Sequence, residues 1–242
     1  IVTYGFNPQA VVRGHNIRIK PEGQMFDVDI TLRDGEIRQI RDIMLPMHGQ
    51  HNVSNSLASI AIAHELKLAD DVIKNAFTDF EGVKRRFTKT GEAQGMTIID
   101  DYGHHPVEIA ATLKAARAAQ DAAGGRVIAV VQPHRYTRLR DLFKEFSTCF
   151  NDADAVIVAD VYSAGEDPID GIHADALVDG LRSPGHKQVI KLESEEKLAA
   201  EVANIGQQGD MVVCLGAGSI TKWAYALPEQ LDKQAKQKTK AS

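Results

Sequence analysis

The chain has 242 residues, of which 43% are hydrophobic and 25% are charged, and its formal net charge is −5. This composition is typical of soluble globular proteins and excludes a disordered or collagen-like chain. The acidic balance argues against a general nucleic-acid partner. No stretch approaches the ~18 apolar residues that span a bilayer, so we predict no membrane partner and a cytoplasmic location. Since the chain begins with Ile1 rather than Met, we expect its gene to begin further upstream.

The first part of the chain reads as an antiparallel meander followed by two helices. Apolar and polar residues alternate in three segments, with turn residues at Pro21-Glu22-Gly23 and Asp34-Gly35 between them. After Gly49 the apolar spacing changes to that of helices, first over residues 53–64 and then over residues 72–80. The predicted strands cover residues 11–19, 26–32 and 36–45.

From residue 96 onward, short apolar runs alternate with amphipathic helical patterns. This alternation predicts a doubly wound α/β domain with a mostly parallel, buried sheet. We place the domains at residues 1–87 and 88–228, separated near a polar stretch that contains Gly91, with a flexible tail at 229–242. Cys149 and Cys214 fall in apolar contexts and are expected to be buried rather than paired. The predicted strands cover residues 96–100, 127–131, 155–160, 188–192 and 210–215.

Two segments of the first domain carry candidate ligand contacts. Asn52 and Asn55 lie three apart in the run GQHNVSN at residues 49–55, so both face one side of a helix start. They suit either a helix cap or the edge of an adenine base, since a carboxamide both donates and accepts. Arg86 follows the second helix, where a cation either complements the helix dipole or contacts a phosphate.

The segment DDYGHHP at residues 100–106 is the most informative of the α/β domain. It follows a predicted strand and precedes a helix that starts at Pro106. Residues at the carboxyl ends of parallel strands face the crevice where such sheets bind ligands. Asp101, Tyr102 and His104 are therefore candidate site residues. A metal site is the rival interpretation, but no further Cys/His cluster with ligand spacing supports it, and we predict no metal ligands.

The segment QPHRYTR at residues 132–138 has the same placement after the next strand. Arg135 and Arg138 lie at a predicted helix start, where cations oppose the helix dipole, and this favours a role in binding a carboxylate or a phosphate. After the last strand, Gly216 and Gly218 resemble the start of a dinucleotide fingerprint. The third glycine is missing, so a tight strand-to-helix turn is the preferred interpretation.

Taken together, these runs resemble the Mur ligase family over about residues 1–228. The resemblance rests on the runs at residues 49–55, 85–87, 100–106 and 132–138. It implies a Rossmann-like C-terminal domain, preceded by the trailing part of the family's central ATP-binding domain. The last two runs point to the branch that adds L-alanine to UDP-N-acetylmuramate in peptidoglycan synthesis, or to the murein peptide ligases. A free-standing nucleotide- or amino-acid-binding module is the non-enzymatic alternative.

The resemblance also implies a chemistry and roles for these residues. Such ligases use ATP and Mg²⁺ to activate the substrate carboxylate as an acyl phosphate, which the amine of the amino acid then attacks. By this resemblance His51, Asn52 and Asn55 hold the adenine, and Asp101 and Tyr102 touch the nucleotide. His104, Arg135 and Arg138 position the alanine and the acyl centre, and Arg86 contacts the ATP phosphates. The P-loop and the metal-binding residues of the family are not found in this chain, so we expect it not to turn over ATP alone.

Overall fold

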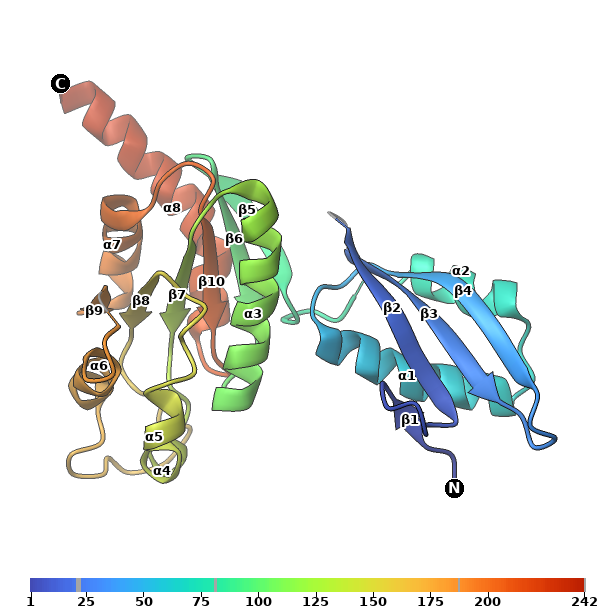
Figure 1. Ribbon diagram of the computed structural model, residues 1–242. Coiled ribbons are helices and arrows are strands. Elements are labelled where there is room, and N and C mark those ends of the chain that lie inside the picture. The colour runs from blue at the N-terminus through green and yellow to red at the C-terminus, as the bar shows by residue number, and fades with distance from the viewer. Residues whose placement is uncertain (21–22, 81, 187, 242) are drawn as a thin grey trace. The chain divides into compact units, whose positions relative to one another are not determined.

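The computed structural model describes residues 1–20, 23–80, 82–186 and 188–241. The chain forms two compact units, Ile1–Val83 and Lys84–Ser242 (Figure 1). The predicted boundary between residues 87 and 88 therefore lies inside the second unit. The reason is that Tyr102 N–H donates to the carbonyl of Arg85, and Phe87 N–H donates to Oδ2 of Asp101. In the described part of the chain, no helix is both long and apolar enough to cross a membrane.

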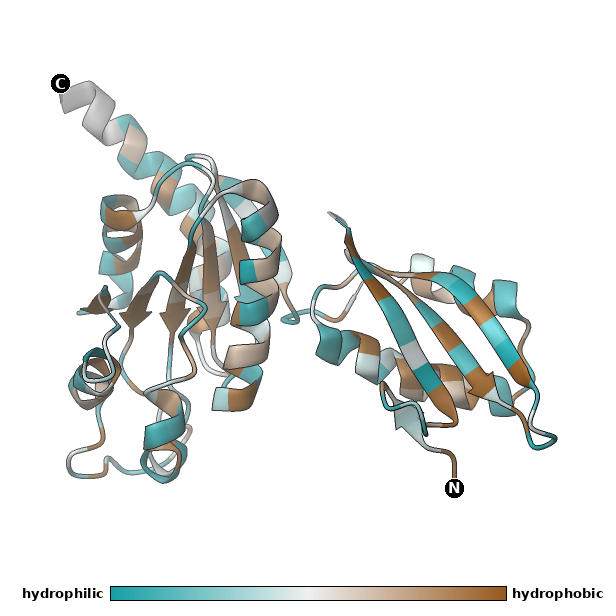
Figure 2. Ribbon diagram, in the orientation of Figure 1, coloured by the Kyte–Doolittle hydropathy of each residue, from teal (hydrophilic) through white to brown (hydrophobic). Residues whose placement is uncertain are grey.

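The first unit is a four-stranded sheet with two helices on one face. Strands β2, β3 and β4 pair antiparallel, as predicted, whereas the short β1 pairs parallel with β2. The apolar residues that alternate along these strands (Figure 2) pack against α1 through Leu57 and Ile60. The turn at Asp34-Gly35 is present, while Pro21 and Glu22 lie outside the described residues. The elements are β1 (Tyr4–Gly5), β2 (Val12–Lys20), β3 (Gly23–Thr31), β4 (Ile37–Leu45), α1 (Gln50–Glu65) and α2 (Asp70–Thr78).

The second unit confirms the predicted α/β class. Its sheet has the order β5-β6-β10-β7-β8-β9, in which only β5 runs antiparallel to its neighbour. The last strand in sequence, β10, lies between β6 and β7. The strands are β5 (Thr88–Ala93), β6 (Met96–Asp101), β7 (Val127–Val131), β8 (Ala155–Val158), β9 (Val189–Lys191) and β10 (Met211–Leu215). The helices are α3 (Pro106–Ala123), α4 (Tyr136–Asp141), α5 (Phe143–Phe146), α6 (Ala174–Arg182), α7 (Leu198–Ile205) and α8 (Ile220–Ala241).

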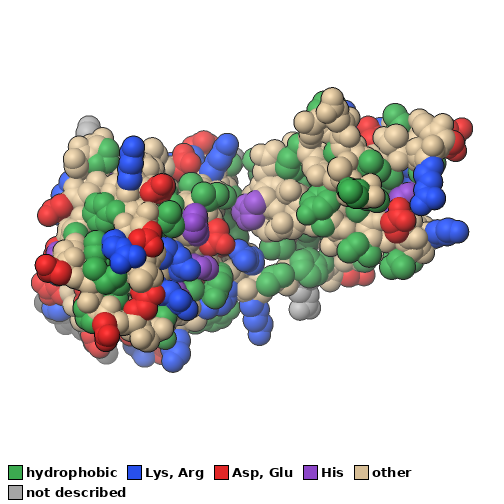
Figure 3. Space-filling view, turned by 90° about the horizontal axis from the view of Figure 1, so that it is seen from below, with side chains coloured by type: hydrophobic (Ala, Val, Ile, Leu, Met, Phe, Trp, Pro, Cys, Tyr) green, Lys and Arg blue, Asp and Glu red, His purple; other side chains and the backbone are tan. Residues whose placement is uncertain are grey.

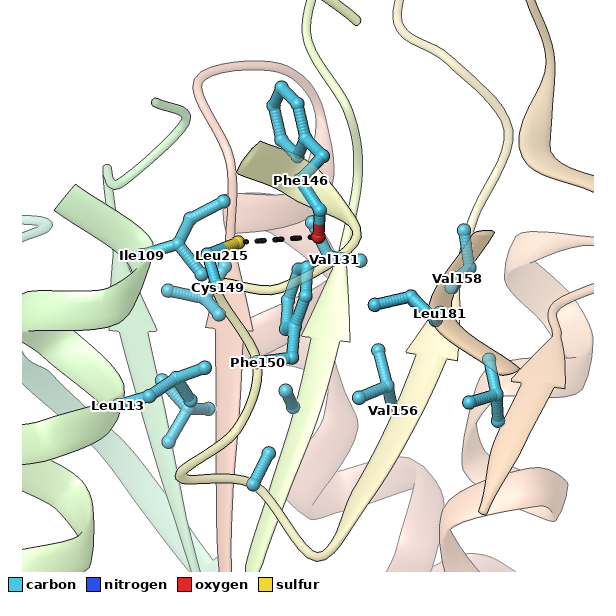
Figure 4. Close-up of a cluster of buried hydrophobic side chains, with 14 of the residues drawn as sticks. Ile109, Leu113, Val131, Phe146, Cys149, Phe150, Val156, Val158, Leu181 and Leu215 are labelled. Atoms are coloured by element: carbon cyan, nitrogen blue, oxygen red, sulfur yellow. Dashed lines mark hydrogen bonds between the residues drawn. The ribbon is translucent and has the colours of Figure 1, made fainter. Parts of the chain in front are cut away.

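Both faces of this sheet are covered by helices. Alternate strand residues enter two separate apolar clusters, one beneath α3, α5 and α6 and the other beneath α7 and α8. Figure 4 shows the first cluster, in which Phe150 lies fully buried beside Cys149. Cys149 and Cys214 are unpaired and buried, as predicted, and burial raises the pKa of the Cys149 thiol to about 12.

Two features near the domain ends were not anticipated from the sequence. The polar stretch around Gly91 forms the edge strand β5. The segment after Pro228 continues α8, and Leu231 in it is fully buried. A proline removes the N–H that would bond to the carbonyl four residues earlier. Here the Thr90 hydroxyl donates to that carbonyl, of Ala224, at 2.8 Å, so the helix passes through Pro228 without an unsatisfied acceptor.

Candidate functional site

The candidate site lies at the carboxyl edge of the sheet in the second unit. Strands β6, β10, β7 and β8 are parallel, so the loops that follow them all leave the sheet at this edge. This is where open α/β sheets bind ligands. Figure 3 views the molecule from below, onto this edge of the second unit, and shows His, Lys and Arg side chains gathered there beside acidic ones.

Asp101 holds the loop after β6 together. Its side chain is only 3% exposed. Oδ1 accepts from Gly103 N–H at 2.8 Å and from the Thr112 hydroxyl at 3.1 Å, while Oδ2 accepts from Phe87 N–H at 2.8 Å. Burial raises the pKa of Asp101, although these hydrogen bonds oppose the shift. These hydrogen bonds show that the carboxylate holds the loop, and its contact with a nucleotide stays a prediction.

Tyr102, the next residue, lies under two guanidinium groups. The Cζ atom of Arg85 is 4.6 Å from the centre of the Tyr102 ring, and that of Arg86 is 5.9 Å away. Both distances are within the range of a cation–π interaction. The structure thus brings the predicted residues Arg86 and Tyr102 together, and it adds Arg85, which the sequence interpretation did not single out.

Four rings form a continuous row across the edge, which we call the aromatic row: Tyr102, His104, His134 and Tyr162. The ring centres are 5.1 Å apart for Tyr102 and His104, 5.6 Å for His104 and His134, and 5.5 Å for His134 and Tyr162. The last pair is stacked, and the first two are edge-to-face. Such contacts fix ring orientation, so the row joins the loops after β6, β7 and β8 into one surface.

The hydrogen bonds of His104 indicate which of its two ring nitrogens carries the proton. Its Nδ1 lies 2.9 Å from the Tyr102 carbonyl, which can only accept, so Nδ1 carries the proton. In the neutral ring Nε2 then holds the lone pair. Oε2 of Glu108 accepts from the backbone N–H groups of His104 and His105. Burial raises the pKa of Glu108, but these bonds together with the electrostatic effect of His104 and Arg86 outweigh burial and lower the pKa. His105 caps α3 by accepting from Val107 N–H, so its role is structural.

His134 was missed in the sequence, although it lies inside the quoted run at residues 132–138. Its Nδ1 is 3.2 Å from Nη1 of Arg138, which also donates to the His134 carbonyl at 3.0 Å. Because a guanidinium cannot accept, Nδ1 of His134 accepts and Nε2 carries the proton. Burial, followed by the charges of Arg138 and His104, lowers the pKa of His134. The two imidazoles of the row therefore present opposite polarity: Nε2 accepts on His104 and donates on His134.

Arg135 is the most exposed cation of the site. It occupies the position before α4 with φ 74°, a left-handed conformation that is unusual for a residue with a side chain. In the first turn of this helix, Glu166 accepts from the N–H and the hydroxyl of Thr137. Nη1 of Arg135 lies 3.9 Å from Glu166, which leaves this guanidinium half exposed.

The glycine turn after β10 packs closely against Gln132 and against Tyr162 of the aromatic row. A Cβ atom on Gly218 would lie 2.5 Å from Oε1 of Gln132 and 2.6 Å from Cγ of Tyr162. Gln132 Oε1 also accepts from Ile220 N–H at the start of α8. The two glycines are thus explained by close packing at the strand-to-helix turn, in agreement with the preferred interpretation. Beside the turn lies a cavity of about 350 Å³, lined by residues that include Tyr162, Ser163, Glu193 and Trp223.

The remaining predicted residues, His51, Asn52 and Asn55, lie at the start of α1 in the first unit. Asn52 is buried, and its Nδ2 donates to the His48 carbonyl at 2.7 Å, whereas Asn55 is exposed. Gly49 precedes the helix with φ 97°, and a Cβ there would lie 2.6 Å from the His51 ring. Only glycine satisfies both constraints. Among residues 1–20, 23–80, 82–186 and 188–241, no group of three or more His, Cys, Asp or Glu side chains could hold a metal ion.

Comparison with known proteins places the chain in a family. Residues 85–218 match the glutamate ligase domain of the Mur ligases, and residues 1–63 match the Mur ligase middle domain. The UDP-N-acetylmuramate–L-alanine ligase of Phenylobacterium zucineum is 60% identical over 96% of this chain and 48% of its own length. The enzyme of the same name from Brucella ovis is 57% identical, over 98% of this chain and 50% of its own.

Solved structures agree on the fold. A UDP-N-acetylmuramate–alanine ligase from Thermotoga maritima superposes with a TM-score of 0.76 at 24% identity, over 96% of this chain and 48% of that chain. A murein peptide ligase from Psychrobacter arcticus gives 0.62 at 19% identity, over 95% of this chain and 46% of that chain. The chain spans about half the length of the curated relatives that it matches. The match over residues 85–218 covers more than half of the sequence, and the chain belongs to the Mur ligase family.

Proposed function

We propose that this chain is part of an ATP-dependent ligase that joins L-alanine to the carboxylate of UDP-N-acetylmuramate. The observation that carries the proposal is the carboxyl edge of the second unit. There Arg86 and Tyr102 lie together beside Arg135, Arg138 and the paired imidazoles. The identity of 57–60% to ligases of that name supports the choice of substrates.

In the proposed reaction the amine nitrogen of alanine attacks the carbonyl carbon of an acyl phosphate. A C–N bond forms, the bond from carbon to the phosphate oxygen breaks, and phosphate leaves. The attacking amine must first lose a proton, and Nε2 of His104 is placed to accept it because Nδ1 is already protonated. Arg135, which is half exposed, is available to the carboxylate of alanine or to the phosphoryl oxygens.

The nucleotide contacts form the second part of the proposal. In the second unit the Tyr102 ring would touch a nucleotide and Arg86 its phosphates. In the first unit His51, Asn52 and Asn55 would be nucleotide contacts, with the two amides suited to a base. Asp101 remains a candidate nucleotide contact, and it also holds the neighbours of Arg86 and Tyr102 by accepting from Phe87 N–H and Gly103 N–H. Mg²⁺ is expected for this chemistry, and the described residues contain no group of three or more His, Cys, Asp or Glu side chains that could hold it.

The test uses the gene product that carries this sequence. We expect phosphate release from ATP that depends on both UDP-N-acetylmuramate and L-alanine. The variant Arg135→Gln should raise KM for alanine or lower kcat with little change in Tm, because the 3.9 Å contact with Glu166 is the one ion pair of this guanidinium among the described residues. Phosphate release that does not depend on L-alanine would refute the assignment of L-alanine as a substrate. The purified 242-residue chain alone should release none, and measurable release by it would refute that expectation.

Murein peptide ligase is the second candidate. The cavity of about 350 Å³ beside Tyr162 is larger than an alanine side chain requires, and a longer acceptor could extend into it. Comparing L-alanine with a murein tripeptide as the acceptor in the same assay separates the two candidates. Turnover with the tripeptide alone would favour the second. A non-enzymatic binding module would show ligand binding without either turnover.

A further inference from the structure

We propose that Arg85 is a positioning residue that fixes the ring of Tyr102 for nucleotide binding. This inference rests on the proposed function, because it assumes that Tyr102 touches the nucleotide. The sequence offers two adjacent arginines at residues 85 and 86, and only the second was interpreted as a ligand contact. The structure gives the first a different role.

The backbone of Arg85 forms the first link to Tyr102. The Arg85 carbonyl accepts from Tyr102 N–H at 2.7 Å. Arg85 adopts φ 63°, in the left-handed region where residues other than glycine are uncommon. A segment that maintains this conformation does so because surrounding contacts hold it. This hydrogen bond is one such contact, and it ties Arg85 directly to the loop after β6.

The side chain of Arg85 forms the second link. Its guanidinium carbon lies 4.6 Å from the centre of the Tyr102 ring, 1.3 Å closer than that of Arg86 at 5.9 Å. Nη2 donates to the Gly216 carbonyl at 2.6 Å. The guanidinium therefore spans from the glycine turn to the tyrosine ring. Because the backbone and the side chain of one residue both hold Tyr102, the orientation of the ring is fixed before any ligand arrives.

Asp100 explains why the cation stays in this place. Its carboxylate is fully buried, and its Oδ2 lies 3.8 Å from Nε of Arg85 and accepts from the Thr221 hydroxyl at 2.5 Å. Its Oδ1 has no hydrogen-bond partner in the described residues. A buried carboxylate without a nearby cation is costly, so Arg85 is also held by the charge behind it. The side chain of Arg85 is 24% exposed, and its contacts are to the protein itself.

A double-mutant cycle on nucleotide binding tests the inference. Arg85→Gln, Tyr102→Leu and the double variant are made in the gene product that carries this sequence, and the Kd for ADP is measured by titration calorimetry. We expect Arg85→Gln to weaken binding about five- to tenfold, in line with a partly desolvated cation–π contact. In the Tyr102→Leu background the same change should have no further effect, because Arg85 acts through the tyrosine.

The controls separate this role from a general loss of structure. Arg140→Gln removes a half-exposed arginine that pairs with its neighbour Asp141, and it should leave the Kd unchanged. Arg85→Lys keeps a cation beside Asp100 but loses the planar group, and it should give an intermediate Kd even if the Gln variant fails to fold. Factors that multiply in the double variant would overturn the inference, as would an unchanged Kd for Arg85→Gln. Failure of the unmodified protein to bind ADP would overturn the proposed function as well.

Discussion

Replacing Asp101 by Asn sets two opposing effects against each other. The carboxylate accepts three hydrogen bonds, two at Oδ1 and one at Oδ2. An amide oriented to keep its oxygen toward Gly103 and Thr112 places its NH₂ group against the N–H of Phe87. One bond to a charged acceptor is lost, at a cost of about 1.5–3 kcal/mol. Burial raises the pKa of Asp101, so the neutral side chain recovers part of that cost.

We expect the lost acceptor to outweigh the relieved desolvation. A net loss of about 1–2 kcal/mol in the free energy of unfolding follows, since the Phe87 N–H loses its bond to a charged acceptor. Urea unfolding followed by circular dichroism at pH 7.5 measures it. Thr112→Val is the matched comparison, because it removes one hydrogen bond to the same carboxylate and keeps the charge, at about 1 kcal/mol.

The opposite result, no loss of stability in Asp101→Asn, would contradict this reasoning. If Asp101→Asn is as stable as the unmodified protein or more stable, desolvation of the charge dominates, and Asp101 does not hold the loop as described. The two variants should also differ in how much free energy of unfolding they lose. Thr112→Val should lose less than Asp101→Asn, because the Phe87 N–H keeps its acceptor in that variant.

Three further predictions concern the same unit. Gly218→Ala should lower Tm, since the new Cβ would lie 2.6 Å from Cγ of Tyr162 and overpacking costs about 1–3 kcal/mol. An NMR titration should give His134 a pKa below its usual value, shifted back upward in Arg138→Gln. The folded pKa is depressed, so the stability from neutral His134 is present above the unfolded value of about 6.5 and is lost as pH falls below it. Phe150→Ala should cost about 3–5 kcal/mol in urea unfolding, because the ring is fully buried (Figure 4).

The sequence predicted strands best where both faces of the strand are buried or where buried and exposed residues alternate strictly. The five apolar runs of the α/β domain became the parallel strands β6 to β10, since a strand covered on both faces is apolar throughout. Strand β5 was missed because it is an edge strand whose residues are mostly polar. The continuation of α8 was missed because the local rule for proline ignores Thr90, whose hydroxyl comes from a strand far away in the sequence. Local patterns do not contain such long-range partners.

The same limit of local patterns applies to the candidate site. The runs at residues 100–106 and 132–138 meet at one edge of the sheet, as predicted, because they follow the parallel strands β6 and β7. The partners within each run were not predictable. Nothing in the local pattern distinguishes the exposed Arg135 from Arg138, which is held by His134. The contact between His134 and Tyr162 requires the pairing of β7 with β8, which only the folded sheet provides.

At this edge three acids are used within the protein, whereas Arg135 stays half exposed. Asp101 and Glu108 accept from backbone N–H groups, and Glu166 accepts from the N–H and the hydroxyl of one threonine. Each carboxylate thereby stabilises a loop, and little of its acceptor capacity faces outward. Among the described residues, the one ion pair of Arg135 is the long contact to Glu166, so we expect this guanidinium to meet an anionic substrate although the chain carries a net charge of −5. The charge that a site offers to a ligand depends on which of its own charges already have partners, and the net charge of the chain does not determine it.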